Sequence, residues 1–397
     1  LTQAVQAGLA PASQLEALVA QATSTGGLVA FVNSGDRIEN DMKWDDSLLA
    51  IFGSATNHIT DTLRLTMGLR VSDETKEADL YAGTILPGTM VLSANIAAAL
   101  GNPALAGATI PRQNVAANWP LNGFMNPVDD EFKREKNSTT YSISLQKDLA
   151  DDVMVYTSYA TGFKSGGFNS TGGDDSYPRE YKDEESKNFE AGIKSRINDG
   201  KTQVNATVFN METDGLQGVL QVPSGTGTAV YNSTIPAKRL GLDLNVIHKF
   251  SQNLVMNLGY MKLDDDDADI STNAAIRLTP KMAYNIGLSH FMPFGNGKVH
   301  TRIDYSYDDE MEVTANYSTS PAMATLPASY KEMRDRENLN AKIAWSNDQW
   351  EVAYWIKNGT DQLFERLVTA PSPVGGGNFA VFMMKPKTQG LSVKYNF

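Results

Sequence analysis

The sequence contains no cysteine and little histidine. None of its 397 residues is Cys, and only four are His. The absence of cysteine excludes disulfide bonds and fits a cell-envelope protein that avoids thiol chemistry. The histidines are scattered without the spacing of metal ligands, so we expect no metal site and no cofactor. They are His58, His248, His290 and His300.

The chain also lacks an excess of basic residues. It has 34 Lys and Arg against 46 Asp and Glu, which gives a formal net charge of -12. No basic patch with interleaved aromatic residues appears, and this argues against a nucleic-acid partner. Catalytic signatures are missing too, because no nucleophile elbow, HExxH motif or phosphate loop is present. We therefore predict that the protein is not an enzyme.

A long hydrophobic run is the third absence. Hydrophobic residues make up 41% of the chain. The most apolar long window, residues 90–108, is interrupted by Ser93, Asn95, Gly101, Asn102 and Pro103. These interruptions exclude a transmembrane helix. A membrane β-barrel passes this test unseen, because only alternate residues of its strands face lipid.

The chain does contain many runs in which apolar and polar residues alternate. In residues 63–71 every second residue is apolar. Residues 339–346 and 391–397 follow the same rule, and so do residues 240–250 apart from His248. Side chains alternate across a strand, so each run has one apolar face. The last run continues to the aromatic terminal residue Phe397. Alternation alone leaves open whether the apolar face contacts a soluble core or lipid.

The spacing of turns favours a barrel. Short polar turns lie near residues 60–62, 150–152, 198–200, 251–253, 294–297 and 347–349. Longer segments lie near residues 73–136, 164–184, 214–236, 265–276, 310–332 and 365–378. Short turns at one end and long loops at the other are typical of a transmembrane β-barrel.

Aromatic residues support the same interpretation. Several fall beside the short turns or at the terminus, as expected for a girdle at a membrane interface. They are Phe250, Phe291, Phe294, Trp345, Trp350 and Phe397. The sequence thus predicts an all-β transmembrane antiparallel barrel rather than a soluble sandwich.

The number of runs suggests that the barrel is larger than this chain. Thirteen runs begin near residues 47, 63, 138, 153, 185, 201, 237, 254, 277, 298, 333, 350 and 379. We assign residues 1–46 to an extracellular loop region that leads into the first strand, and residues 47–397 to the barrel. The first and last runs would both point toward the short turns, whereas single-chain bacterial barrels have an even number of strands. We expect these strands to form the carboxyl-terminal part of a larger barrel.

Several segments resemble the β-barrel of TonB-dependent outer-membrane receptors, in the siderophore-receptor branch. Residues 155–169 read VYTSYATGFKSGGFN and resemble a hallmark segment of that family. Residues 189–209, with their Asn-Asp-Gly turn, also resemble it. The likeness extends over about residues 47–397 and includes residues 52–70, 358–361 and 390–397, in the family's order.

The resemblance implies a plugged barrel of about 22 strands in the bacterial outer membrane. Such a receptor takes up a scarce nutrient, most often a ferric siderophore, with energy from the TonB complex of the inner membrane. The plug and the first strands would have to come from sequence outside this chain or from another chain. The expected partners are therefore membrane lipid, the plug, the TonB complex and the nutrient.

Two sets of residues are candidates for function. Ligand contacts are expected from the loop near residues 164–184, since Arg and Tyr suit anionic or aromatic ligands. The candidates are Phe163, Lys164, Phe168, Tyr177, Arg179 and Tyr181. Charges on the luminal face are expected to contact the plug. These are Arg64, Arg70, Glu190, Lys194 and Arg302. A bent loop with an aromatic girdle, and a hydrated wall, are the simpler interpretations of the two sets.

Other functions use the same pattern. A porin that works without TonB, or a structural or adhesive barrel, would show the same strands and loops. An outer-membrane phospholipase would need a Ser/His pair at its lipid-facing rim, and none is apparent. Five carboxylates crowd residues 264–269, but they lack the glycine and final glutamate of a calcium loop. We interpret them as a solvated acidic loop.

Overall fold

The computed structural model describes residues 37–85, 88–91, 104, 107–111, 128–170, 178–221, 228–232, 236–265, 279–311, 334–369 and 380–397. Every secondary-structure element in these ranges is a β-strand. Within them, no helix has the length and apolar character needed to cross a membrane.

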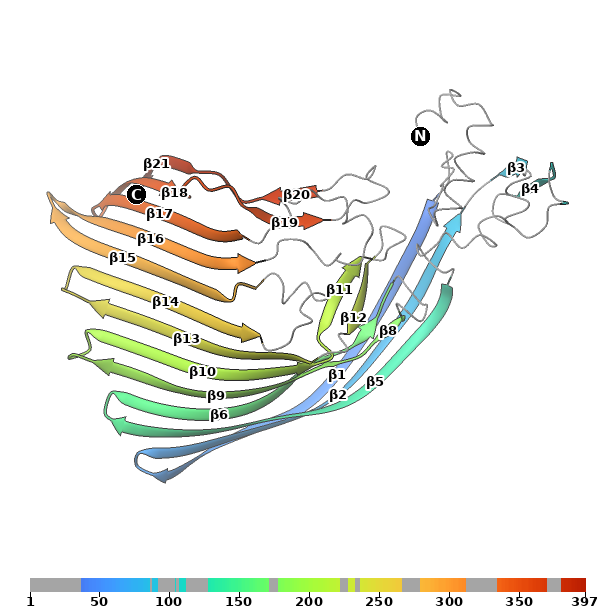
Figure 1. Cartoon of the computed structure of the whole chain (residues 1–397), viewed down its shortest axis with the longest axis horizontal. Helices are drawn as coiled ribbons and strands as arrows, with labels where there is room; N and C mark the ends of the chain where they lie inside the picture. The colour runs from blue at the N-terminus through green and yellow to red at the C-terminus, as the bar shows by residue number, and fades with distance from the viewer. Residues whose placement is uncertain are drawn as a thin grey trace.

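Thirteen strands form one antiparallel sheet, which curves into a single wall (Figure 1). In sheet order they are β1 (Arg37–Thr60), β2 (Leu63–Ile85), β5 (Val128–Ala150), β6 (Val153–Lys164), β9 (Glu184–Ile197), β10 (Thr202–Asp214), β13 (Ala237–Lys249), β14 (Leu254–Asp265), β15 (Met282–Phe294), β16 (Gly297–Met311), β17 (Arg334–Ser346), β18 (Trp350–Lys357) and β21 (Thr388–Tyr395). Each strand pairs with the next in the chain order of the sheet, which is the meander expected of an up-and-down barrel. The predicted fold class and the predicted thirteen strands are confirmed.

Short turns gather at one end of the wall. They join β1 to β2, β5 to β6, β9 to β10, β13 to β14, β15 to β16 and β17 to β18. In the β9–β10 turn, Asn198 and Asp199 have φ values of 56° and 53°, and Gly200 follows at 76°. Asn, Asp and Gly tolerate this left-handed conformation best, so the local sequence fixes the turn.

The other end carries longer connections. Four small hairpins lie there: β3 (Thr89–Val91) with β4 (Thr109–Pro111), β7 (Gly167–Phe168) with β8 (Glu180–Tyr181), β11 (Gln217–Gln221) with β12 (Thr228–Asn232), and β19 (Glu365–Thr369) with β20 (Ala380–Met383). We call this end of the wall the loop end. The asymmetry between the two ends matches the sequence prediction.

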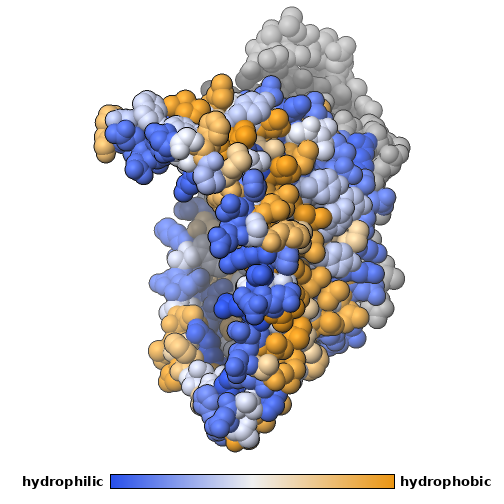
Figure 2. Space-filling model, turned by 90° about the vertical axis from the view of Figure 1, so that its left-hand side faces the viewer, coloured by the Kyte–Doolittle hydropathy of each residue, from blue (hydrophilic) through white to orange (hydrophobic). Residues whose placement is uncertain are grey.

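The strand register assigns each side chain to a face. Leu69 pairs with Gly53 and Tyr141, so the odd-numbered residues of β1, β2 and β5 share one face. The successive registers continue this face across the sheet to Leu240 and Leu391. Large apolar side chains on it are exposed, as Leu240 at 52% and Leu391 at 76% illustrate. In Figure 2, which views the sheet from its short-turn end, apolar side chains cover one side of the wall and hydrophilic ones gather beside the hollow.

Exposure of the apolar face distinguishes a barrel wall from a sandwich. A sandwich would bury Leu240 and its neighbours against a second sheet, about 10 Å away. Among the described residues, the other sheets are the four small hairpins, and each has only two strands. The exposed apolar face therefore needs surroundings as apolar as itself, which the lipid interior supplies.

Three strands run further than the sequence indicates. β1, β2 and β5 contain 24, 23 and 23 residues. The segment near residues 73–136 was predicted to be a loop, but its first and last parts continue β2 and β5 (Figure 1). Charges occupy both faces of these extensions, so the alternation of polarity disappears although the pairing continues. Pairs such as Lys133–Glu77, at 3.1 Å, join neighbouring strands there.

Strand boundaries differ at both ends of the sheet. β1 begins at Arg37, ahead of the expected start near residue 47. The last predicted run near residue 379 divides into β20, which belongs to a loop-end hairpin, and β21. β1 and β21 lie at opposite ends of the strand order, and the described residues show no pairing between them, as the strand count predicts.

Most of the aromatic residues predicted to form a girdle lie beside the short turns, and the girdle itself stays a prediction. Phe250, Phe294 and Trp350 are exposed beside short turns. Trp345 donates its indole N–H to the carbonyl of Phe294 at 3.2 Å. Phe291 is an exception: the register places it on the opposite face from Leu288, and its ring stacks on His300 with centroids 4.3 Å apart. Its predicted place in the girdle was wrong because it lies one residue out of phase.

The assignment of faces predicts the effect of introducing charge. Leu242→Arg places a cation on the apolar face and should lower the free energy of unfolding by about 2–4 kcal/mol near the middle of a membrane. Asn245→Arg, three residues along the same strand, lies on the polar face and should cost little. Equilibrium unfolding of the full-length protein in lipid vesicles measures both. Equal losses would contradict the assignment.

Candidate functional site

The polar face of the wall carries all five luminal charges that the sequence singled out. Successive registers place Arg64, Glu190 and Lys194 on one face, and continue it across the sheet to Arg302. Arg70 shares that face because it lies six residues from Arg64 on β2. The alternation of the strands therefore brings these charges to the concave side. Whether they contact a plug remains a prediction.

Two of these five charges, and Lys342 on the same face, form ion pairs within the wall. Arg64 donates to both carboxylate oxygens of Asp148, at 2.6 and 2.8 Å. Arg302 donates to Asp304, with contacts of 2.5 and 2.8 Å. Lys342 donates to Glu351 at 2.8 Å. Part of the face therefore presents ion pairs rather than bare charges.

Aromatic side chains on the same face lie flat against glycines. The ring of Tyr156 covers Gly192, where an added Cβ would lie 2.7 Å from the Cε1 atom of the ring. Lys194 Nζ lies 5.3 Å from the centroid of this ring, a favourable cation–π distance. Phe209 covers Gly241 in the same way. Because glycine leaves room for each ring, the rings project little into the lumen.

At the loop end, a segment between β6 and β9 folds onto the extensions of β2 and β5. We call residues 165–170 and 178–183 the shelf, since the structure describes these two parts of the segment. Its ionic centre is Asp183, whose side chain is 6% exposed. Asp183 accepts hydrogen bonds from Arg134 at 2.8 Å, from Lys136 at 3.0 Å and from the backbone N–H of Gly166 at 2.7 Å. We call these contacts of Asp183 the clamp.

β2 adds a second row of contacts. Lys76 Nζ donates to the carbonyl of Gly166 at 3.1 Å. Ser165 donates its hydroxyl to Glu74. The side chains of Lys76 and Glu74 are 16% and 15% exposed, so these bonds are partly shielded from water. The shelf is therefore held to two strands of the wall.

A small apolar cluster lies beneath the shelf. Phe168 is 5% exposed, and its ring centroid lies 5.6 Å from that of Phe132 and 6.1 Å from that of Trp44. Ala78 and Leu80, which lie on the extension of β2, are also buried. Phe168 therefore packs the shelf against the wall, which is a structural role that its position in the sequence did not reveal.

The shelf also joins the neighbouring β11–β12 hairpin. Asn169 is 4% exposed. Its amide donates to the carbonyls of Pro178 and Val230, both at 2.9 Å, and its oxygen accepts from Val230 N–H at 2.6 Å. The side-chain amide of Gln217 donates to the carbonyls of Lys164, Ser165 and Lys182, at 3.3, 3.1 and 3.0 Å. Two hairpins far apart in the sequence thus form one unit.

The other predicted ligand contacts have varied surroundings. Phe163 and Lys164 end β6, and Lys164 is exposed. Arg179 is partly exposed and donates to the carbonyl of Ser170 at 3.0 Å. Tyr181 is partly exposed, and its hydroxyl lies beside Gly167. Tyr177 lies outside the described residues. The shelf therefore carries Phe168, Arg179 and Tyr181, with Phe168 turned toward the wall.

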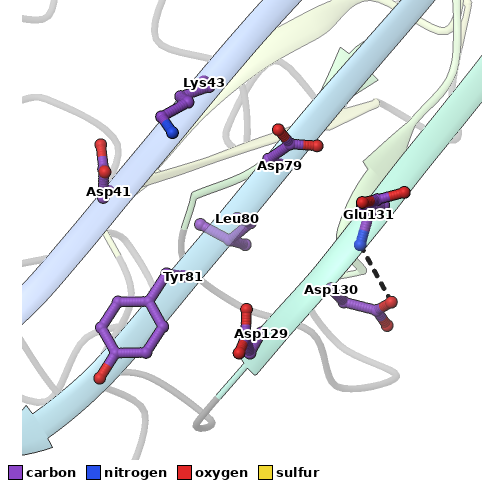
Figure 3. Close-up of a pocket in the computed structure, with 8 residues that line it drawn as sticks. All are labelled: Asp41, Lys43, Asp79, Leu80, Tyr81, Asp129, Asp130 and Glu131. Atoms are coloured by element: carbon purple, nitrogen blue, oxygen red, sulfur yellow. Dashed lines mark hydrogen bonds between the residues drawn. The ribbon is translucent and has the colours of Figure 1, made fainter.

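A groove that the sequence did not predict lies on the outer face of the wall, opposite the face that carries the shelf. It has a volume of about 570 Å³ and lies on the extensions of β1, β2 and β5 (Figure 3). Its lining residues are Asp41, Lys43, Asp79, Leu80, Tyr81, Asp129, Asp130 and Glu131. The groove was missed because its strands were read as loops. Within the described part of the chain, no group of three or more acidic or His side chains is arranged to hold a metal ion.

The acidic run at residues 264–269 is only partly visible. Asp264 and Asp265 end β14, whereas the rest of the run lies outside the described residues. The interpretation as a solvated loop therefore stays a prediction.

Comparisons with known proteins identify the fold family. A family model described as "TonB dependent receptor-like, beta-barrel" matches residues 18–358. Among solved structures, the ferric yersiniabactin uptake receptor FyuA from Yersinia pestis aligns with a TM-score of 0.64 and 14% identity, over 91% of this chain and 47% of that one. The chain thus spans about half the length of that protein.

Two further structures agree. The ferric-catecholate import receptor Fiu from K12 E. coli aligns with a TM-score of 0.62 and 15% identity, over 90% of this chain and 45% of that one. The siderophore receptor PiuA from Acinetobacter baumannii aligns with a TM-score of 0.59 and 14% identity, over 89% of this chain and 44% of that one. At such identities the likeness establishes the fold.

The surroundings of Asp183 predict how acid affects the shelf. Burial alone would raise the pKa of Asp183, but hydrogen bonds from Arg134, Gly166 N–H and Lys136 outweigh it, and the net shift is downward. A depressed pKa in the folded state means that the clamp is stabilising above the ordinary carboxyl range and is lost as pH falls through the depressed value.

We therefore expect the shelf to resist cleavage by an acid-active protease from neutral pH down to about pH 4, and to become sensitive only below that. Glu180 and Glu185 also pair with Arg134 and Lys136, but their side chains are 55% and 62% exposed, so these pairs are weak. Asp183→Asn should therefore lose the clamp already at neutral pH and show little further change on acidification. Loss of protection between pH 7 and 5 would contradict the downward shift.

Proposed function

The chain belongs to the TonB-dependent receptor family, and we propose that it forms the ligand-facing part of an outer-membrane receptor for a ferric siderophore, energised by TonB. The family takes up nutrients across the outer membrane. Siderophore uptake is supported by the solved structures with the same fold, which include a ferric yersiniabactin uptake receptor and a ferric-catecholate import receptor. Because their identity is low, their substrates enter here as part of the proposal.

The proposal rests on two features that occur together. One is the polar luminal face, and the other is the shelf at the loop end, whose backbone is held by hydrogen bonds and ion pairs. The shelf carries Arg179 and Tyr181, and Lys164 is exposed at the end of the adjoining strand. Ferric siderophores are bulky, often aromatic and often anionic. Tyr rings stack on aromatic groups, while Arg and Lys offset negative charge. The loop end therefore offers suitable chemistry to such a ligand.

Passage into the cell would use the polar face. A plug supplied by another part of the receptor would lie against ion pairs such as Arg64–Asp148 and Arg302–Asp304. Exchangeable salt bridges in a wet channel are each worth about 0–1 kcal/mol. A plug held by many such weak contacts would yield to a mechanical pull through TonB.

The test is uptake of ferric siderophores labelled with radioactive iron, by cells that express the full-length protein with or without functional TonB. We expect saturable binding to the surface in both strains and uptake only when TonB works. Uptake without TonB would favour a porin. Absence of surface binding for both catecholate and hydroxamate chelates would overturn the siderophore assignment and leave another nutrient or a structural role.

Loop variants test where the ligand binds. Replacing Tyr177, Arg179 and Tyr181 together by Ala should weaken surface binding by about tenfold or more, since a charge-assisted bond and two stacking rings are lost. The amount of protein in the outer membrane should stay the same. Glu77→Gln, on the outer face of the wall, is the control. Unchanged binding by the triple variant would place the ligand contacts elsewhere.

A further inference from the structure

We propose that Asp183 is a positioning residue for ligand capture, because its clamp fixes the shelf that carries Arg179 and Tyr181. The inference rests on the proposed receptor function and adds a role that the predicted ligand contacts did not include. Asp183 itself has a side chain only 6% exposed, so it acts through the groups that it holds.

Because the clamp is largely buried, it depends on Asp183 more than on the exposed acids nearby. Arg134 is 11% exposed, and it approaches Asp183 more closely than Glu180, at 2.8 Å against 3.2 Å. The side chain of Glu180 is 55% exposed, so water screens that pair strongly. Removing the charge of Asp183 leaves Arg134 partly buried beside only a peripheral acid. The clamp therefore depends on Asp183 rather than on Glu180.

The clamp acts at the base of the shelf, where its two chain segments meet. Asp183 binds the backbone N–H of Gly166 across the segment. An added Cβ at Gly166 would lie 2.8 Å from the carbonyl carbon of Lys182, so the two segments are in tight contact. Glycine is required at this position because only glycine permits the approach.

From this base, contacts continue to the proposed ligand-binding residues. Asn169 N–H donates to the carbonyl of Arg179 at 2.6 Å. The side-chain amide of Asn169 also holds the carbonyl of the preceding residue, Pro178. Tyr181 pairs with Gly167 across the β7–β8 hairpin. The backbone on each side of Arg179 and Tyr181 is therefore fixed before a ligand arrives.

Preorganisation of this kind raises affinity without any new contact with the ligand. A loose shelf must be ordered during binding, and ordering each rotamer-rich side chain opposes association. A shelf held by Asp183 is already ordered when the protein folds, so binding does not have to order it. Ligand affinity should then depend on a residue that the ligand does not touch.

The experiment compares Asp183→Asn with Glu77→Gln in the full-length protein on intact cells. Each variant removes one negative charge from an ion pair of the β2–β5 extensions. Glu77 is the matched control because its pair with Lys133 is on the outer face and more than half exposed. The probes are ferric catecholate and ferric hydroxamate siderophores labelled with radioactive iron. Binding isotherms separate the Kd from the number of sites.

We expect Asp183→Asn to raise the Kd about tenfold or more, to leave the number of sites unchanged, and to make the shelf sensitive to protease at neutral pH. Glu77→Gln should match the unmodified protein in all three. Gly166→Ala keeps the charge of Asp183 but forces the segments apart, and should also raise the Kd. A purely structural role would lower the number of sites and leave the Kd unchanged.

The outcomes distinguish the two proposals. A sensitive shelf with an unchanged Kd in Asp183→Asn would overturn the positioning role while the receptor function stands. A protected shelf would overturn the clamp itself. Failure of the unmodified protein to bind either chelate would overturn the receptor function, and the positioning role with it, whatever the protease result.

Discussion

The pairing of backbone amides is the constraint on which the rest of the structure depends. Lipid offers no hydrogen bonds, so each amide and carbonyl within a membrane must find a partner in a neighbouring strand. The antiparallel ladders from β1 to β21 supply those partners. Once the register is set, alternation fixes the face to which each side chain points. Leu242 points to one side of the wall, and Asp243 to the other. The lipid-facing surface and the charged lumen are two consequences of one register.

Away from the membrane, a different interaction takes over. The shelf has only a small apolar cluster around Phe168, so polar side chains must position its backbone. A buried polar group that lacks a partner is costly, and this makes each satisfied one specific. Asn169 uses both its amide and its oxygen, and Gln217 reaches three carbonyls. The loop end is therefore ordered by directed bonds, whereas the wall is ordered by its periodic ladder.

This difference explains what the sequence could predict. Strands such as β2 and β6 were predictable where one face contacts lipid. That face must be apolar, so apolar and polar residues alternate along the strand. The extensions to Ile85 and from Val128 have water or loops around them, so charges occur on both faces and the signal vanishes. The burial of Phe168 was equally hidden. Its partners Trp44 and Phe132 are remote in the sequence, and only the folded sheet brings them together.

The luminal charges were predicted with the right facing but without their partners. Arg64 and Arg302 are each neutralised within the wall, by Asp148 and Asp304. A paired wall attracts a moving partner less strongly than bare charges would, since any new salt bridge must replace an existing one. Such a surface suits a lumen through which something has to slide. If the proposed receptor function holds, selectivity would rest on the shelf, where buried hydrogen bonds position the backbone. In that case the paired wall need not discriminate among ligands, because the shelf at the loop end would do so.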